Sequence, residues 1–290
     1  MTAPKKILKG HFKGYFKGKI QEQLTLLLLA LSFFTRIPIN LSAEITPIQL
    51  SKASRYFAVV GILVGVICSL VYMVSVAYLP KSIAVLIAMA ASLLVTGAFH
   101  EDGWADVWDG FGGGWSIEQK LNIMKDSRLG TYGAAALFVI LMLKFQSLMV
   151  LASPIMALIL AHTLSRVVAT SLIYSMPYVT VTVDATSKVK PLAQELSKNS
   201  LMILLITGLV VSLWFLPLTE CILLFVILFI FRVLLVFWFN RQLGGYTGDC
   251  LGAAQQSSEI IIYLSLLIFG YSEVIVNVSQ SINTSLGVIS

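Results

Sequence analysis

Long apolar runs recur along this chain, and they restrict its fold more than any other feature. Each is long enough to cross about 30 Å of hydrocarbon as an α-helix. Hydrophobic residues make up 58% of the sequence and charged residues only 12%, which excludes a soluble domain of this size. The sequence therefore predicts an all-α, polytopic membrane bundle of about seven helices, at residues 56–79, 83–99, 131–152, 154–176, 201–218, 221–239 and 260 to about 278.

A basic and aromatic segment precedes these runs. Residues 1–23 include KKILKGHFKGYFKGK, which is typical of a tail lying on an anionic cytoplasmic lipid surface. No fold that reads bases follows it, so nucleic acid is not an expected partner. Residues 24–34 are apolar but too short to span, and they predict a short re-entrant or interfacial helix. We therefore expect a tail at 1–23 and a single membrane-embedded catalytic domain at 24–290.

Lys and Arg are concentrated on one side of the predicted bundle. Most of the Lys and Arg residues after the tail lie in the long loops, at 35–55, 100–130, 177–200 and 240–259. The short turns hold only Lys81. By the positive-inside rule the long loops lie in the cytoplasm and the C-terminus lies outside. The prediction is a multi-pass protein of the cell inner membrane whose candidate site faces the cytoplasm.

The stretch HEDGWADVWDGFGGG, which begins at residue 100, carries three aspartates at helical spacing. Asp102, Asp106 and Asp109 are spaced i, i+4 and i+7, so on a helix their carboxylates share one face and repel one another unless a cation is present. Such oxygen ligands suit Mg²⁺, which shares its remaining coordination sites with substrate phosphates. A solvated loop is the alternative interpretation of an acidic, glycine-rich stretch. The adjoining glycine and cationic residues favour phosphoryl or nucleotidyl transfer.

Two further segments are expected to complete this site. Lys125, Asp126 and Arg128 place phosphate-seeking cations beside a carboxylate about twenty residues downstream. The glycine-rich stretch LGGYTGDCLGAAQQSSE, at 243–259, includes Gly248 and Asp249 and allows a close backbone approach to a ligand. By itself such a stretch is more often a helix cap, but here it is predicted on the same membrane side as the aspartates.

Four basic residues lie within or beside apolar runs. An ionisable residue inside the membrane is a functional hypothesis, and His162 and Arg166 are i, i+4 on one helix face. Arg166 is expected to bind phosphate or a core carboxylate, with snorkelling as the alternative, and His162 to be a hydrogen-bonded core residue. Lys144 is either an interior ion pair or a misplaced span boundary. Arg36, in FFTRIP, is either an anion contact at the rim of the site or an interfacial anchor.

These motifs, taken together, resemble the adenosylcobinamide-GDP ribazoletransferase family, the cobalamin synthases of bacteria and archaea. The resemblance runs from about residue 24 to 259, although Glu101 and Trp104 stand where aliphatic residues are expected. It rests on HEDGWADVWDGFGGG, IMKDSRLGTYG and GGYTGDCLGAA, with FFTRIP, the SR pair at 165–166 and MPY at 176–178. It implies an Mg²⁺-dependent membrane enzyme that joins α-ribazole, or its 5′-phosphate, to adenosylcobinamide-GDP. The products are adenosylcobalamin, or its phosphate, and GMP.

The resemblance and the spacing together give each candidate residue a role. Metal neutralises a diphosphate, and cations hold the departing phosphate. The expected catalytic and metal-binding carboxylates are Asp102, Asp106 and Asp109, completed by Asp126 or Asp249, and the expected substrate-binding residues are Lys125, Arg128, Arg166, Arg36, Gly248 and Asp249. Oligomeric state and association with other corrinoid-pathway enzymes are left open.

Two other classes of protein share some of these features. CDP-alcohol phosphotransferases also place spaced aspartates at a membrane end, and Asp106 to Gly110 fits the start of their motif, but Phe-Gly follows where Ala-Arg is expected. A transporter or cation channel would be expected to carry its acids near the bilayer midplane. Here the acidic motif lies at the end of a span. Metal-dependent GMP release would separate an enzyme from a transporter.

Overall fold

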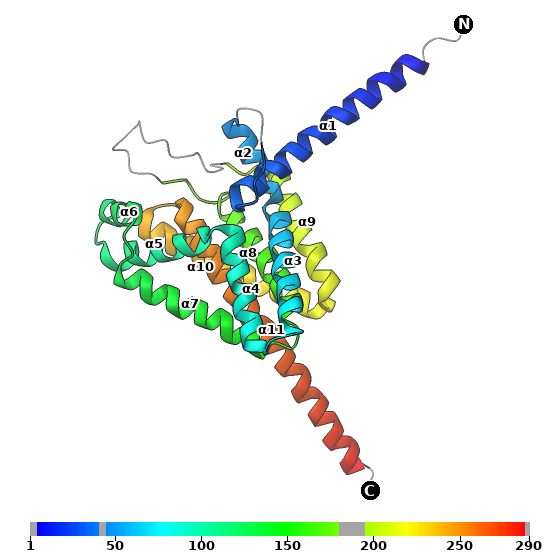
Figure 1. Ribbon diagram of the computed structural model, residues 1–290, viewed down its shortest axis with the longest axis vertical. Coiled ribbons are helices and arrows are strands. Elements are labelled where there is room, and N and C mark those ends of the chain that lie inside the picture. Colours follow the sequence, from blue (N-terminus) through cyan, green and yellow to red (C-terminus); the bar gives the residue numbers. More distant parts are fainter. Residues whose placement is uncertain (1–4, 41–44, 180–194, 288–290) are drawn as a thin grey trace.

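The computed structural model describes residues 5–40, 45–179 and 195–287, and every named element in these ranges is a helix, which confirms the all-α prediction (Figure 1). The order is α1 (Lys5–Phe34), α2 (Pro47–Ala53), the 3-10 turn η1 (Ser54–Tyr56), α3 (Phe57–Val76), α4 (Lys81–Thr96), α5 (Phe99–Gly113), α6 (Ile117–Lys125), α7 (Thr131–Val150), α8 (Pro154–Leu172), α9 (Lys198–Phe215), α10 (Leu218–Leu243) and α11 (Gly248–Gly287).

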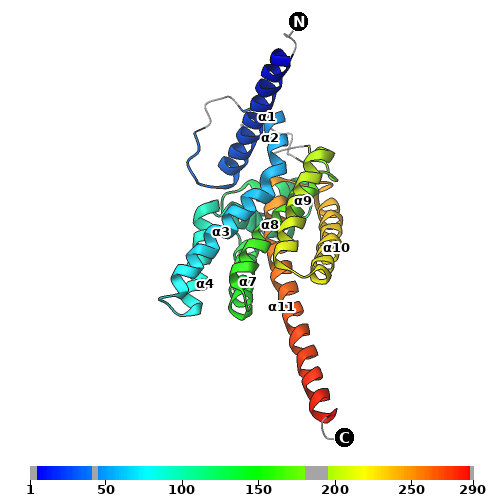
Figure 2. The same cartoon turned by 90° about the vertical axis from the view of Figure 1, so that its right-hand side faces the viewer.

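Long apolar helices form a bundle that is suited to a membrane. Within the described ranges, six helices are long and apolar enough to cross, and α4 with α5 gives a seventh crossing when the bent pair is taken as one. Figure 1 places α1, α5 and α6 toward one end of the bundle, and Figures 1 and 2 place the far part of α11 at the other. We call the first of these the α5 end. The predicted polytopic helical bundle and the order of its long apolar helices are therefore confirmed, with six such helices, or seven if the bent pair is counted.

Two boundaries predicted from polarity are wrong. The basic residues before 24 and the apolar residues after it form one continuous helix, α1, rather than a tail and a separate short element. The stretch 248–259, predicted as loop, is the first third of α11. Its start is set by Thr247, whose hydroxyl accepts the Cys250 N–H at 3.3 Å, a helix N-cap. Of the loop predicted at 177–200, residues 180–194 lie outside the described ranges.

A sharp bend turns α5 across the α5 end of the bundle. The axes of α4 and α5 differ by 88°, and the two residues between them, Gly97 and Ala98, have φ values of +68° and +55°. Left-handed backbone is costly for a residue with a Cβ, and Ala98 is the one non-glycine residue in the described part of the chain that adopts it. The aspartate motif consequently lies beyond the bend, on a helix that runs across the α5 end of the bundle.

Glycines allow α5 to cross directly over the first turn of α11. A Cβ added at Gly103 would lie 2.9 Å from the Cα of Asp249, and one at Gly252 would lie 3.1 Å from the His100 carbonyl oxygen. Such distances require small residues on both helices. The two glycine-containing motifs, far apart in the sequence, are thus held backbone to backbone.

The centre of the bundle is α8. Most of its side chains are buried, including His162 and Arg166, and it packs against α3 where Gly65 approaches Ile159. A charged residue on such a helix has no route to water, so snorkelling by Arg166 is excluded. Its partners must lie inside the bundle.

Candidate functional site

Four carboxylates gather where α5 crosses the start of α11. The pKa of the Asp106 carboxyl is raised to about 7, first by burial and then by the negative charges of Asp249, Asp102 and Asp109. The backbones meet between Asp102 and Asp106, because a Cβ added at Gly103 would lie 2.9 Å from the Cα of Asp249. The structure therefore brings together the acidic motif and the Asp249 motif, as predicted from the sequence, and a cation would relieve their repulsion.

Asp109 has a second set of partners that the spacing did not reveal. Its side chain is buried, with Oδ2 accepting the N–H of Gly130 at 2.7 Å and Oδ1 accepting the N–H of Gly133 at 2.8 Å. Both donors belong to the first turn of α7, which has no other side-chain cap. Asp109 thus fixes α7 to α5, and Asp102, Asp106 and Asp249 are the carboxylates that remain for a ligand.

These carboxylates do not form a complete metal cage by themselves. In the described part of the chain, no three His, Cys, Asp or Glu side chains are arranged to hold an ion. Mg²⁺ is commonly bound by only one or two carboxylates, with water and substrate phosphates supplying the other oxygens. The residues present fit that type of site, in which the substrate completes the coordination.

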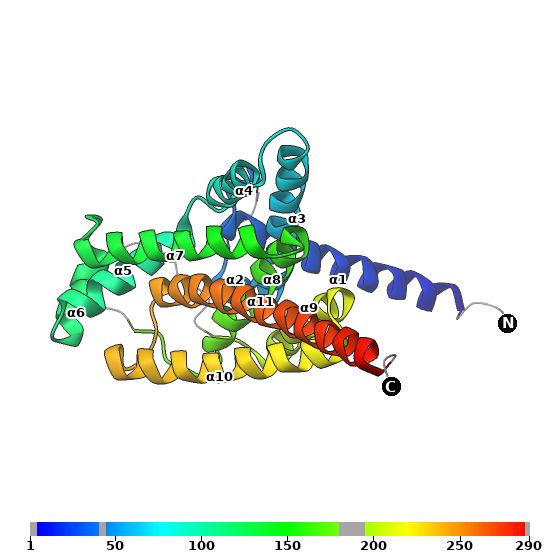
Figure 3. The same cartoon turned by 90° about the horizontal axis from the view of Figure 1, so that it is seen from below.

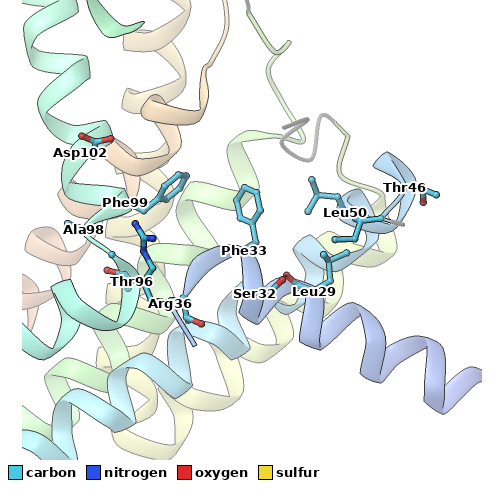
Figure 4. Close-up of a pocket in the computed structure, with 13 residues that line it drawn as sticks. Leu29, Ser32, Phe33, Arg36, Thr46, Leu50, Thr96, Ala98, Phe99 and Asp102 are labelled. Carbon is cyan, nitrogen blue, oxygen red and sulfur yellow. The ribbon is translucent and has the colours of Figure 1, made fainter. Parts of the chain in front are cut away.

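A cavity of about 830 Å³ opens beside Asp102 (Figure 4). Arg36 and Phe99 line it together with Asp102, and the other walls come from the end of α1, from α2 and from the bend after α4. Arg36 is held in place because its N–H donates to the Val95 carbonyl at 2.7 Å and its guanidinium packs over Gly97. The FFTRIP motif therefore places a cation in the same cavity as a site carboxylate, consistent with the predicted anion contact.

The downstream basic cluster is only partly engaged with the site. Arg128 donates to both carboxylate oxygens of Asp126, and these hydrogen bonds lower the pKa of Asp126. Both side chains are solvated, and Lys125 is exposed at the end of α6. The turn that carries them reaches the acidic cluster through Gly130, which binds Asp109. Asp126 is thus paired with its neighbour and is not among the carboxylates that perturb Asp106.

Arg166 does not lie in the open cavity. Its Nη1 donates to the His162 carbonyl at 2.8 Å, while Nε and Nη2 are buried without a hydrogen-bond partner. The space beside it, which Gly248 also lines, is about 20 Å³. That is room for about one water molecule and too little for a phosphate group. In this conformation Arg166 and Gly248 line this small space and not the cavity beside Asp102, so they do not contact a ligand in that cavity.

A buried network of charges, largely missed by the sequence analysis, lies deeper in the bundle. Glu259 is fully buried, forms ion pairs with Lys144 at 2.5 Å and His162 at 2.7 Å, and accepts a hydrogen bond from Gln255 at 2.6 Å. The prediction that His162 has a partner in the core is confirmed, and of the two alternatives for Lys144 the structure shows the interior ion pair. Glu259, at the end of the stretch predicted as a loop, instead joins α7, α8 and α11.

The network also reaches the helix that carries the aspartates. Glu101, next to Asp102, accepts from Gln256 at 2.8 Å, and Lys144 lies 4.0 Å away. Glu101 is on α5 and Gln256 on α11, so their contact reinforces the crossing that brings Asp106 to Asp249. The spacing of Gln255, Gln256 and Glu259 along one helix was the signal that could have revealed these partners.

A further contact joins two of the shorter motifs. Val179 N–H donates to the Tyr246 carbonyl at 2.8 Å, and Tyr246 N–H donates to the Pro177 carbonyl at 3.0 Å. The MPY segment after α8 is thereby paired with the GGY segment before α11. This bridge fixes the chain that leads into Thr247 and Asp249.

The fold and the site together define a polytopic membrane protein with a cavity of about 830 Å³, lined by Asp102 and Arg36, at one end of its bundle. Buried acids of the kind expected in a permease are also present, but Glu259 is fully engaged by Lys144 and His162. Asp102, Asp106 and Asp249, which form no ion pair with a described residue, lie at the α5 end. This arrangement favours an enzyme over a transporter.

Comparison with known proteins identifies the family. The model of the cobalamin-5-phosphate synthase family matches residues 26–267, and the chain belongs to this family. The adenosylcobinamide-GDP ribazoletransferase of Shewanella frigidimarina is 54% identical over 86% of this chain and 97% of its own length. The corresponding protein of Shewanella piezotolerans is 52% identical over 87% of this chain and 98% of its own. No solved structure matches the chain.

Proposed function

We propose that this chain joins adenosylcobinamide-GDP and α-ribazole, or α-ribazole 5′-phosphate, and releases GMP. A ribose hydroxyl oxygen that is free in both acceptors, and therefore not the 5′-oxygen, forms a bond to the phosphorus attached to cobinamide, and the bond from that phosphorus to the GMP oxygen breaks. The hydroxyl proton passes to a base, and GMP leaves with the electron pair of the broken bond. Relatives that match over nearly their whole length carry this activity in their names.

The observation that carries the proposal is the convergence of Asp102, Asp106 and Asp249 beside the cavity that Arg36 also lines. Phosphoryl transfer requires a diphosphate to be held and neutralised while the two reactants are aligned. One or two of Asp102, Asp106 and Asp249 would hold Mg²⁺ together with oxygens of the substrate, and the ion when bound supplies positive charge to the diphosphate. Arg36 binds a phosphate oxygen from the cavity side, and one carboxylate accepts the proton.

The orientation in the membrane is part of this proposal. We propose that the α5 end faces the cytoplasmic side of the cell inner membrane, because the loops at this end hold most of the Lys and Arg. A cysteine introduced in the exposed turn at Lys125 should escape an impermeant thiol reagent in intact cells and react after lysis. Labelling in intact cells would reverse the orientation.

The test of the activity uses purified protein in detergent or nanodiscs. With both substrates and Mg²⁺, we expect equal amounts of GMP and a new corrinoid that contains ribazole, resolved by mass spectrometry. Omitting the ribazole or chelating the metal should abolish both products. Unchanged substrates under the complete conditions would refute the proposal.

A further inference from the structure

A second cavity lies on the opposite side of α5 from the aspartates. It has a volume of about 520 Å³ and is bounded by Trp104 and Trp108 of α5 and by residues of α7, α10 and α11. Figure 3 shows α11 running between α7 and α10, and the cavity lies along this part of the bundle. Its α7 wall extends from Thr131 to Leu143, which is about 18 Å of helix at 1.5 Å per residue. We call it the α7–α10 groove.

The groove is apolar and borders the lipid-facing surface. Val139 and Leu143 line it and are largely exposed, and Phe138 beside them is exposed as well. In a membrane such surface faces acyl chains. A groove about 18 Å long that starts at the α5 end spans roughly one leaflet of a 30 Å hydrocarbon core.

The α5 end of the groove has features that suit the polar part of a lipid. The indole N–H of Trp104 is buried without a hydrogen-bond partner, and Trp108 packs against Trp238 of α10 with ring centroids 6.1 Å apart. Trp side chains prefer the membrane interface, where the N–H meets ester and headgroup oxygens. Lys120, hydrogen-bonded to Gln242 of α10 at 2.6 Å, places a cation at the same end.

We propose that the α7–α10 groove binds one acyl chain of a phospholipid from the leaflet at the α5 end, with Trp104 donating to an ester oxygen of that lipid. The chain fills apolar space that protein side chains leave open. It also supports the apolar face of α5, whose opposite face carries Asp102 and Asp106. The inference does not depend on the reaction, because it rests on the groove and on the unpartnered indole alone.

Two adjacent alanines on α7 provide a matched test. Ala135 lines the groove and Ala134 does not, although both are exposed. Ala135→Phe should fill the groove, whereas Ala134→Phe should add the same ring to the outer surface. In native mass spectrometry of protein extracted from phosphatidylethanolamine and phosphatidylglycerol membranes, we expect one retained phospholipid in the wild type and in Ala134→Phe. At least a tenfold loss of that species is expected in Ala135→Phe.

Quenching of Trp104 fluorescence gives a second test, which does not require the phospholipid to stay bound in the mass spectrometer. In a variant whose other tryptophans are replaced by Phe, Trp104 fluorescence should be quenched by phosphatidylcholine brominated on one acyl chain. Ala135→Phe should relieve the quenching and Ala134→Phe should not. Equal quenching and equal lipid retention in the two variants would overturn the proposal. Displacement of the quencher by adenosylcobinamide-GDP would assign the groove to substrate instead.

Discussion

Replacing Asp106 with Asn is expected to lower turnover by about 100-fold or more while the protein still accumulates in the membrane. Asp106 lies at the centre of the carboxylate cluster, where Asp249, Asp102 and Asp109 all act on it. The amide preserves the shape of the side chain but removes the charge that would attract a divalent cation. Asp102→Asn and Asp249→Asn should behave in the same way, and higher Mg²⁺ should partly restore each single variant.

Two other aspartates serve as matched controls, because the structure gives them different partners. Asp126 is solvated and paired with Arg128, so Asp126→Asn should leave turnover within about twofold. Asp109→Asn should weaken the start of α7 by about 1 kcal/mol, since an amide cannot accept from both Gly130 and Gly133 in the same way. If Asp126→Asn lowered turnover as much as Asp106→Asn does, Asp126 would belong to the site together with Asp106.

Loss of Glu259 is expected to be the most destabilising single change in the buried network. Glu259→Ala leaves Lys144 in the bundle interior without its 2.5 Å partner, and an uncompensated buried charge costs about 3–5 kcal/mol. We expect a large fall in the thermal unfolding temperature of the detergent-solubilised protein. Glu118→Ala, at an exposed position on α6, should stay within about 0.5 kcal/mol of the wild type.

The paired substitution separates charge balance from packing. Lys144→Met combined with Glu259→Gln removes both charges, and it should recover part of the stability lost in Glu259→Ala. Because Glu101 and Gln256 connect this network to α5, a stable double variant should also retain binding of adenosylcobinamide-GDP. If Glu259→Ala and Glu118→Ala unfold at the same temperature, the network contributes nothing to stability.

The order of the crossings followed from the sequence because hydrocarbon thickness sets the length of a spanning helix, and hydropathy reports that length directly. The start of α11 could not be predicted in this way, because a hydropathy pattern assigns polar residues to exposed loops. Gln255, Gln256 and Glu259 are polar yet buried, since their partners come from α5, α7 and α8. Contacts between distant segments determine this boundary, and a local pattern cannot show them.

The site was also predictable only in part, because local spacing and charge were informative and contacts between distant segments were not. Helical spacing correctly placed Asp102, Asp106 and Asp109 near one another, and the positive-inside pattern correctly placed the Asp249 motif at the same end. Spacing could not show that Asp109 caps α7 or that Arg166 lies in a space of about 20 Å³. It also did not reveal the bend at Gly97 and Ala98, which turns the helix that carries the aspartates across the α5 end of the bundle.

The central claim is that the carboxylates and the substrate diphosphate bind one divalent ion together. Electron paramagnetic resonance of Mn²⁺, added in place of Mg²⁺, measures this directly, because adenosylcobinamide-GDP contains diamagnetic cobalt(III). We predict tight binding of Mn²⁺ to the wild type and to Asp126→Asn only when adenosylcobinamide-GDP is present, and loss of that binding in Asp106→Asn. Undiminished Mn²⁺ binding in Asp106→Asn, or none in the wild type with substrate, would contradict it.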